Sequence, residues 1–225
     1  MAEKINIIYE DNHLLVVQKP INILSQADKT GEKDLLQLLK QLIKERDHKP
    51  GNVFLGLVHR LDRPVGGLMV FAKTSKAASR LSDEIRQHLL QKSYLAILDS
   101  TKLPKQGTLE DYLKKDHKQN KVFVSTCKEG KFARLSYRIL AQKKGKSLVH
   151  IDLETGRPHQ IRVQFASRGW PLLHDQRYHF QSSKEPICLF AYRLCFLHPI
   201  KKTMLTFELH PKMIGDWMIF KKELL

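Results

Sequence analysis

Alternation between short apolar runs and polar turns predicts that strands make up most of this chain. The runs are rich in Val, Ile, Leu and Phe, which is typical of buried and half-buried strands. Gly66 and Gly67 are interpreted as a turn that precedes one of them. The predicted strands are residues 5–9, 14–17, 54–61, 68–72, 93–98, 122–126, 133–140, 148–153, 188–197 and 203–209.

A few segments instead carry the signals of helices. Apolar residues recur at helical spacing between residues 33 and 46, and Ser75 is interpreted as the N-cap of a helix that runs to about residue 90. Residues 159–167 and 211–221 are interpreted as a short helix and a closing helix. Many strands, few helices and no regular βαβ alternation predict an α+β fold with a mixed sheet.

The length of the chain, 225 residues, is enough to bury a core without a disulfide or a metal. We therefore expect a single domain over residues 1–225, as one large body or two intimate lobes. The cysteines, Cys127, Cys188 and Cys195, form no C-x-x-C pair, and their odd number argues for a reducing compartment. No signal-like apolar run and no stretch of membrane-spanning length is found, so we expect a cytoplasmic protein without a membrane anchor.

Charge changes this picture most. Lys and Arg number 39 and Asp and Glu 23, so the formal net charge is +16. Such an excess favours a polyanionic partner, because neutralised phosphates release their counterions. The basic run at residues 114–121 is the best candidate for a contact with a nucleic-acid backbone outside an active site. A lysine-rich soluble protein without such a partner is the alternative interpretation.

Three segments contain residue types that could carry chemistry. His59-Arg60-Leu61-Asp62 lies at the end of a predicted strand, where a charged cluster is by itself more typical of a surface ion pair. Tyr94 lies near the start of an apolar strand, either as a core tyrosine or as a face for an unstacked base. The third segment, at a Gly-Pro turn leading into a helix, is either an anion site or a solvated helix start. It contains Arg157, His159, Gln160 and Arg162.

Together and in this order, these motifs resemble the RluA-type pseudouridine synthase family, from about residue 8 to about residue 209. Each motif is weak evidence alone, whereas their order and spacing are specific. The resemblance implies that family's catalytic fold, a mixed, largely antiparallel bent sheet with flanking helices and a central cleft. The matching segments are residues 9–20, His59-Arg60-Leu61-Asp62 with Gly67, Lys92-Ser93-Tyr94, residues 155–162, and Gly169, Pro171, Asp175 and Tyr178.

The resemblance implies that the protein isomerises specific uridines to pseudouridine in ribosomal or transfer RNA. Asp62 would be the essential nucleophile, Tyr94 would contact the flipped base and is a proposed proton acceptor, and Arg162 would pair with the aspartate. Arg60 would fill the gap that the flipped uridine leaves, and His59 would support the site rather than act as a general base. The other expected substrate-binding residues are Arg157, His159 and Gln160.

The residue types agree with this chemistry. The glycosidic bond of uridine must break, and the base must turn and rejoin the ribose through ring carbon 5, without redox change or hydrolysis. We therefore expect no cofactor and no metal. An ionised carboxylate can attack the sugar or remove a sugar proton, and the sequence leaves both routes open. The base must also leave its stack, which costs about a few kcal/mol that contacts from a basic groove can offset.

Three departures from the family pattern concern the choice of RNA. Val65 and Gly66 stand where many relatives carry two hydroxyl residues, and His174 stands where they carry glycine, near the expected cleft. We expect no N-terminal RNA-binding module of the kind that many relatives carry. RNA selection would then fall to the catalytic domain and its basic run, and a monomer is the default expectation.

Two functions from other classes compete with this hypothesis. A non-catalytic RNA-binding protein could retain the fold, although the joint presence of Asp62, Tyr94 and Arg162 counts against it. A metal-dependent nucleic-acid hydrolase is disfavoured, because the 11 histidines are scattered and form no H-E-x-x-H or comparable ligand set.

Overall fold

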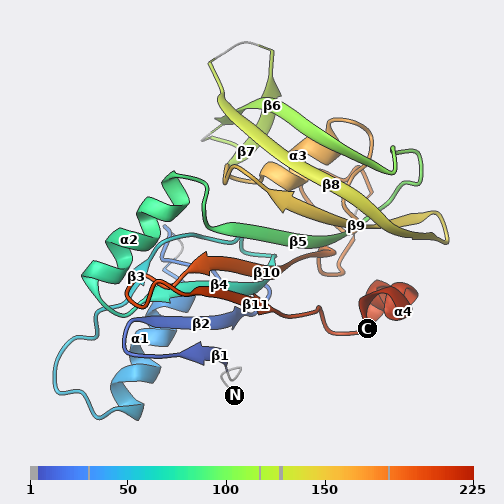
Figure 1. The fold of residues 1–225 in the computed structure, drawn as a ribbon. Coiled ribbons are helices and arrows are strands. Elements are labelled where there is room, and N and C mark those ends of the chain that lie inside the picture. Colours follow the sequence, from blue (N-terminus) through green and yellow to red (C-terminus); the bar gives the residue numbers. More distant parts are fainter. Residues whose placement is uncertain (1–4, 30, 117, 127–128, 182) are drawn as a thin grey trace. The chain divides into compact units, whose positions relative to one another are not determined.

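The computed structural model describes residues 5–29, 31–116, 118–126, 129–181 and 183–225 (Figure 1). Cys127, and His117 within the basic run, lie outside the described residues. The chain forms two compact units, the first of Met1–Leu90 with Arg193–Leu209 and the second of Gln91–Tyr192 with His210–Leu225. The expectation of a single domain over residues 1–225 stays a prediction.

The strands of the first unit are β1 (Asn6–Glu10), β2 (Leu14–Lys19), β3 (Gly56–Leu57), β4 (Gly66–Ala72), β11 (Met204–Glu208) and, from Arg193 on, β10 (Leu189–Leu197). They follow the order β1-β2-β4-β10, with β3 paired to β4 and β11 to β10 (Figure 1). The pairings of β1 with β2, β2 with β4 and β10 with β11 are antiparallel.

Two helices accompany this sheet. In α2 (Ser75–Arg86), Ala77 and Leu81 join the core formed by the apolar side chains of β2, β4 and β10. In α1 (Leu35–Arg46), the residues at helical spacing, such as Leu39, are the buried ones. The N-cap of α2 is Thr74, whose side chain accepts a hydrogen bond from the N–H of Ala77, so the expected cap at Ser75 was wrong by one residue.

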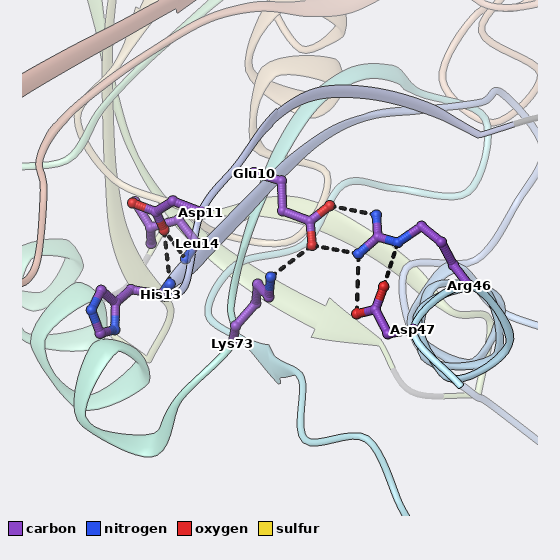
Figure 2. Close-up of polar contacts among 7 residues, drawn as sticks. All are labelled: Glu10, Asp11, His13, Leu14, Arg46, Asp47 and Lys73. Atoms are coloured by element: carbon purple, nitrogen blue, oxygen red, sulfur yellow. Dashed lines mark hydrogen bonds and ion pairs between the residues drawn. The ribbon is translucent and has the colours of Figure 1, made fainter. Parts of the chain in front are cut away.

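A cluster of charged residues fixes the turn between β1 and β2 (Figure 2). Glu10 accepts hydrogen bonds from Arg46 at the end of α1 and from Lys73 after β4, each at 2.6 Å. Arg46 and Lys73 lower the pKa of Glu10 to about 2, Arg46 having the larger effect. Within the turn, Asp11 accepts the backbone N–H groups of His13 and Leu14, both at 2.8 Å. Residues distant in sequence thereby hold the edge of the first sheet.

The strands of the second unit are β5 (Gln91–Leu98), β6 (Gln106–Asp116), β7 (Lys121–Ser125), β8 (Lys131–Lys143) and β9 (Lys146–Leu153). Their order is β5-β9-β8-β6-β7, and every neighbouring pair is antiparallel. The α+β class with a largely antiparallel sheet, expected from the sequence, is therefore confirmed.

Helical segments cover the two faces of this second sheet. On one face, Ala133 of β8 packs with Val163 of α3 (Gln160–Ala166). On the other face, Leu148 of β9 packs with Phe220 of the 3-10 helix η1 (Gly215–Phe220) and with Leu224 of α4 (Lys221–Leu224). The closing helix expected over residues 211–221 is thus shorter and begins later.

Several predicted elements differ from the observed ones. Within residues 54–61 only Gly56 and Leu57 form a strand, because the side chain of His59 takes the N–H of Val70 in β4 and the side chain of Ser25 takes both backbone groups of Leu61. Gly66 and Gly67 lie inside β4 rather than in a turn, and α2 ends at Arg86 rather than near residue 90. Strand β6 was not predicted, since only Leu109 and Leu113 interrupt its polar sequence as fully buried apolar residues.

Candidate functional site

The expected nucleophile, Asp62, lies in a short irregular segment between β3 and β4. Its backbone carbonyl accepts the N–H of Val65 at 3.0 Å, which closes a turn over Arg63 and Pro64. The side chain of Asp62 is partly exposed, whereas Leu61 before it is buried. The buried side chain of Leu61 thus anchors the segment, while Asp62 stays partly exposed.

A serine from a distant segment fixes the residue before Asp62. The hydroxyl of Ser25 donates to the carbonyl of Leu61 at 2.8 Å and accepts the N–H of Leu61 at 3.1 Å. Ser25 is itself buried. Both backbone groups of Leu61 are therefore satisfied by one side chain, and this arrangement restricts the peptide that leads into Asp62.

A buried lysine fixes the residue after Asp62. Lys19, at the end of β2, is fully buried and donates from Nζ to the carbonyl of Arg63 at 3.0 Å and to that of Pro20 at 2.8 Å. Burial lowers the pKa of Lys19 to about 7, while the negative charge of Asp62 opposes this shift and the positive charge of Arg63 adds to it. Lys19 thus holds the backbone beside the expected nucleophile, and its amino group interacts electrostatically with Asp62.

His59 and Arg60 precede the nucleophile in the same segment. The Nε2 atom of His59 accepts the N–H of Val70 in β4 at 3.1 Å, so its lone pair is already used inside the fold. This geometry agrees with a supporting role for His59. Arg60 is exposed to solvent.

In the second unit, Tyr94 lies in β5 and is buried. Antiparallel register places it opposite Ile151, and Ile151 lies opposite Tyr137 of β8. Partners that face each other share one face of a sheet. Since the ring of Tyr137 contacts Phe165 of α3 at 5.3 Å between centroids, Tyr94 lies on the face that α3 covers.

The buried partner of Arg162 within this unit is Asp175. Arg162, in α3, donates to both carboxylate oxygens of Asp175, at 2.8 and 2.7 Å. Burial by itself would raise the pKa of Asp175, but the bonds from Arg162 lower it, with help from the N–H groups of Arg177 and Tyr178. A bidentate pair of this kind fixes the plane of the guanidinium group.

Tyr178 connects Arg162 to the hairpin of β6 and β7, which we call the basic hairpin because it contains the basic run at residues 114–121. Its ring lies 5.3 Å from the guanidinium carbon of Arg162. Its hydroxyl accepts the N–H of Val122 in β7 at 2.9 Å and lies 2.8 Å from Nδ1 of His159. The neighbouring Arg177 donates to the carbonyl groups of Gln119 and Asn120 in the hairpin turn.

His159 adopts a left-handed backbone conformation, which residues other than glycine adopt infrequently. With φ at 51°, it lies in the left-handed region directly before α3, and it makes no side-chain capping bond. Its ring instead meets Tyr178.

Gln160 and Arg157 brace the start of α3. The side-chain oxygen of Gln160 accepts the N–H of Arg157 at 3.0 Å and the hydroxyl of Thr155 at 2.8 Å. Its amide nitrogen donates to the carbonyl of Arg134 at 3.0 Å. The Nε atom of Arg157 donates to the carbonyl of Phe132 at 2.8 Å. All of these hydrogen bonds are to other groups of the chain, although Arg157 remains partly exposed.

His174, one of the departures from the family pattern, also has a left-handed backbone, with φ at 63°. Its Nε2 atom lies 2.8 Å from the carboxylate of Asp216 in η1, and its Nδ1 atom lies 2.8 Å from the hydroxyl of Ser183. Glycine would adopt this backbone without strain. The imidazole therefore ties the C-terminal segment to the loop after Asp175.

The structure divides the expected site residues between the two units. His59, Arg60 and Asp62 belong to the first, and Tyr94, Arg157, His159, Gln160 and Arg162 to the second. Sequence reasoning missed the roles of Ser25 and Lys19, and it gave no partner within the unit for Arg162. Asp175, Tyr178 and Lys19 were within the matched motifs, so a signal existed for them, whereas nothing singled out Ser25.

No group of three or more His, Cys, Asp or Glu side chains in the described ranges could hold a metal ion. In the same part of the chain, no helix combines the length and apolar character that crossing a bilayer requires.

Comparison with known proteins extends the motif resemblance. The model of the family described as RNA pseudouridylate synthase matches residues 13–167. An uncharacterized RNA pseudouridine synthase of Aquifex aeolicus is 33% identical over 97% of this chain and 69% of its own length. The ribosomal large subunit pseudouridine synthase D of Nitrosomonas europaea is 32% identical over 92% of this chain and 62% of its own length.

The ribosomal large subunit pseudouridine synthase C of Buchnera aphidicola is 34% identical over 77% of this chain and 54% of its own length. The chain thus spans between about half and about two thirds of these relatives. Among solved structures, human RNA Pseudouridylate Synthase Domain Containing 4 matches with a TM-score of 0.78 over 97% of this chain and 92% of that chain. At 21% identity, this match shows a shared fold.

Proposed function

Because the chain belongs to the RNA pseudouridylate synthase family, a family of isomerases, we propose that it converts uridine to pseudouridine in RNA with Asp62 as the nucleophile. The family match confirms the resemblance drawn from the motifs. The observation that carries the proposal for Asp62 is the bracing of its segment by Ser25 and Lys19. A carboxyl group held on both sides yet partly exposed has the preorganisation that a nucleophile needs.

In this proposal, the carboxylate of Asp62 acts at the ribose, either by attack on the sugar or by removal of a sugar proton. Tyr94 contacts the flipped base and accepts a proton. Arg162 supplies positive charge, and its bidentate pair with Asp175 sets the plane of its guanidinium group. Burial of Arg162 supports this role, because a charge acts more strongly where water is excluded.

The remaining residues bind or position the RNA. Arg60, being exposed, fills the gap in the RNA, and His59 holds the segment against β4. We assign Arg157 and His159 to substrate contact and Gln160 to positioning the start of α3. The internal bonds of Gln160 support this division. We propose that residues 1–225 act as a single catalytic domain.

The substrate that we propose is structured ribosomal RNA. Relatives from several bacteria are named ribosomal large subunit pseudouridine synthases C or D, and the net charge of +16 suits a polyanion. We place the reaction in the cytoplasm and expect the protein to act as a monomer.

Mapping of pseudouridines in total RNA from cells with and without this protein tests the proposal. We expect one or a few ribosomal sites to disappear with the protein and to return with the wild-type gene. Loss of sites in transfer RNA alone would redirect the substrate and keep the reaction. If no pseudouridine in any RNA depends on the protein, the non-catalytic RNA-binding alternative replaces the enzyme.

A further inference from the structure

One face of the second unit's sheet is open over β6, β7 and β8. Side chains alternate along a strand, so the buried Ala133 and Leu135 of β8 point to the α3 face and Phe132 and Arg134 point to the other. The C-terminal segments η1 and α4 cover that other face only near β5, β9 and the far end of β8. The remainder, which we call the outer face, is exposed.

Aromatic side chains lie across the outer face on three neighbouring strands. Phe132 of β8 lies opposite Tyr112 of β6, with ring centroids 5.8 Å apart in an edge arrangement. Phe123 of β7 lies opposite Lys114 of β6. Phe132 and Phe123 are 40% and 44% exposed, so both rings are accessible from this face. The three rings and a lysine thus form one cluster.

Polar and basic side chains continue the outer face along β8. Arg134 lies 3.1 Å from Glu110 and 3.4 Å from Glu154, so its charge is shared. Arg138, further along, makes no ion pair with a carboxylate in the described part of the chain. From Phe132 to Arg138 the face extends about 20 Å at the rise of an antiparallel strand.

A shallow pocket of about 290 Å³ lies at the Arg138 end of the outer face. Its lining brings together amide, hydroxyl, guanidinium and carboxylate groups, which can bond to the edges of a nucleobase. The lining includes Gln106, Thr108, Ser136, Arg138, His150 and Asp152.

We propose that the outer face binds an unpaired stretch of RNA, by stacking bases on Tyr112, Phe123 and Phe132 while basic side chains hold the backbone. Exposed aromatic rings interleaved with cations on a sheet are the means by which proteins bind single strands. The charge of the chain fits this occupant better than a protein partner, because the core of a protein interface is depleted in charged residues. The inference rests on the proposed function only in taking RNA as the occupant.

This surface lies on the side of the sheet opposite the residues of its own unit that we propose for chemistry, Tyr94 and Arg162. Tyr94 and α3 lie on the opposite face of the same sheet. An RNA strand bound to the outer face therefore adds affinity without touching the residues proposed for chemistry. We expect the surface to affect KM for a long RNA and to leave kcat unchanged.

Binding of a fluorescent single-stranded RNA of twelve uridines to the full chain tests the inference. Phe132→Ala and Phe123→Ala each weaken binding about tenfold, and the double variant weakens it on the order of 100-fold. Phe132→Tyr keeps a ring at the position and retains binding. Phe180→Ala serves as the matched control, since Phe180 is 85% exposed and lies in a loop outside the outer face.

Circular dichroism establishes that each variant is folded, and exposed positions should tolerate these changes. Wild-type binding in the double alanine variant would overturn the inference, and so would failure of the wild type to bind the oligonucleotide. In either case a protein partner becomes the occupant to test. Pseudouridine formation is measured separately, so a failure of the proposed enzyme activity is distinguishable from a failure of this surface.

Discussion

The hydroxyl of Ser25 forms a reciprocal pair of hydrogen bonds with the backbone of Leu61, as donor at 2.8 Å and as acceptor at 3.1 Å. The two residues are 36 positions apart, and both are buried. Asp62 follows Leu61 directly, so this pair limits the freedom of the peptide that carries the proposed nucleophile.

Ser25→Ala should leave two buried backbone groups of Leu61 without a partner. We expect the free energy of unfolding to fall by about 1–3 kcal/mol. We also expect kcat to fall while RNA affinity is kept, since the change loosens the segment of Asp62. Denaturant unfolding and steady-state kinetics measure the two effects. Ser82→Ala, at an exposed position of α2, is the matched control, and an equal effect there would contradict the role of Ser25.

Asp62→Ala should abolish pseudouridine formation and spare RNA binding. Loss of a nucleophile typically lowers kcat on the order of 10⁴-fold or more. A tritium-release or mass-spectrometric assay measures formation, and a filter-binding assay measures affinity. Retained turnover would exclude Asp62 as the nucleophile, and loss of binding together with turnover would indicate a structural defect.

Lys19 predicts a pH dependence of stability. Its pKa is about 7 in the folded protein and near 10.5 when unfolded, so between these values the unfolded chain binds more protons and stability rises with pH. The cost of burying the ammonium group is present in full below pH 7 and is relieved as pH rises toward 10.5. Lys19→Met should remove this rise.

The difference in unfolding free energy between wild type and Lys19→Met, followed from pH 6 to pH 10, isolates this effect from the tyrosines that titrate in the same range. A difference that stays constant over that range would show that the lysine does not titrate there.

Tyr178→Phe should keep the ring beside Arg162 and remove the bonds to Val122 and His159. We expect a loss of about 1 kcal/mol in stability and a higher KM for RNA, because the basic hairpin is held less firmly. Tyr9→Phe removes a hydroxyl that bonds to Asp11 in the first unit, and it should leave KM unchanged. Equal KM values for the two variants would contradict the prediction that the hydroxyl of Tyr178 supports RNA binding by holding the basic hairpin.

RNA affinity should fall steeply with salt. With several phosphates neutralised, we expect the Kd to rise on the order of 10³-fold between 50 and 200 mM monovalent salt. Fluorescence anisotropy at several salt concentrations gives the slope. A flat dependence would be incompatible with a binding surface built on basic side chains.

The sequence predicted those parts of the fold that depend on local pattern. Apolar runs located most strands, and helical spacing located α1, with Leu39 and Ile43 buried as expected. Strand β6 escaped detection because only Leu109 and Leu113 are buried apolar residues and charged residues such as Asp111 and Lys115 share their face, which hides the alternation. The end of α2 was misplaced because residues 87–90 keep helical composition after the helix has stopped.

For the site, too, the sequence predicted what local motifs determine and missed what contacts between distant residues determine. Ordered motifs singled out Asp62, Tyr94 and Arg162, and their catalytic roles stay predictions. The contacts that orient them join residues far apart in sequence, as Ser25 and Leu61 do, and no local pattern encodes such a pairing. The left-handed backbone of His159 was equally hidden, since no local pattern specified it.

The discontinuity of the first unit has a consequence for how the protein is made. Leu194 and Phe196 complete the core that Leu14 and Leu68 begin, and the ring of His198 bonds to Asp11. A chain that leaves the ribosome from its N-terminus must therefore leave this core without Leu194 and Phe196 until residues 91–192 have been synthesised. We expect the nascent first unit to depend on chaperones during that interval, while the second unit, nearly continuous in sequence, starts to fold earlier.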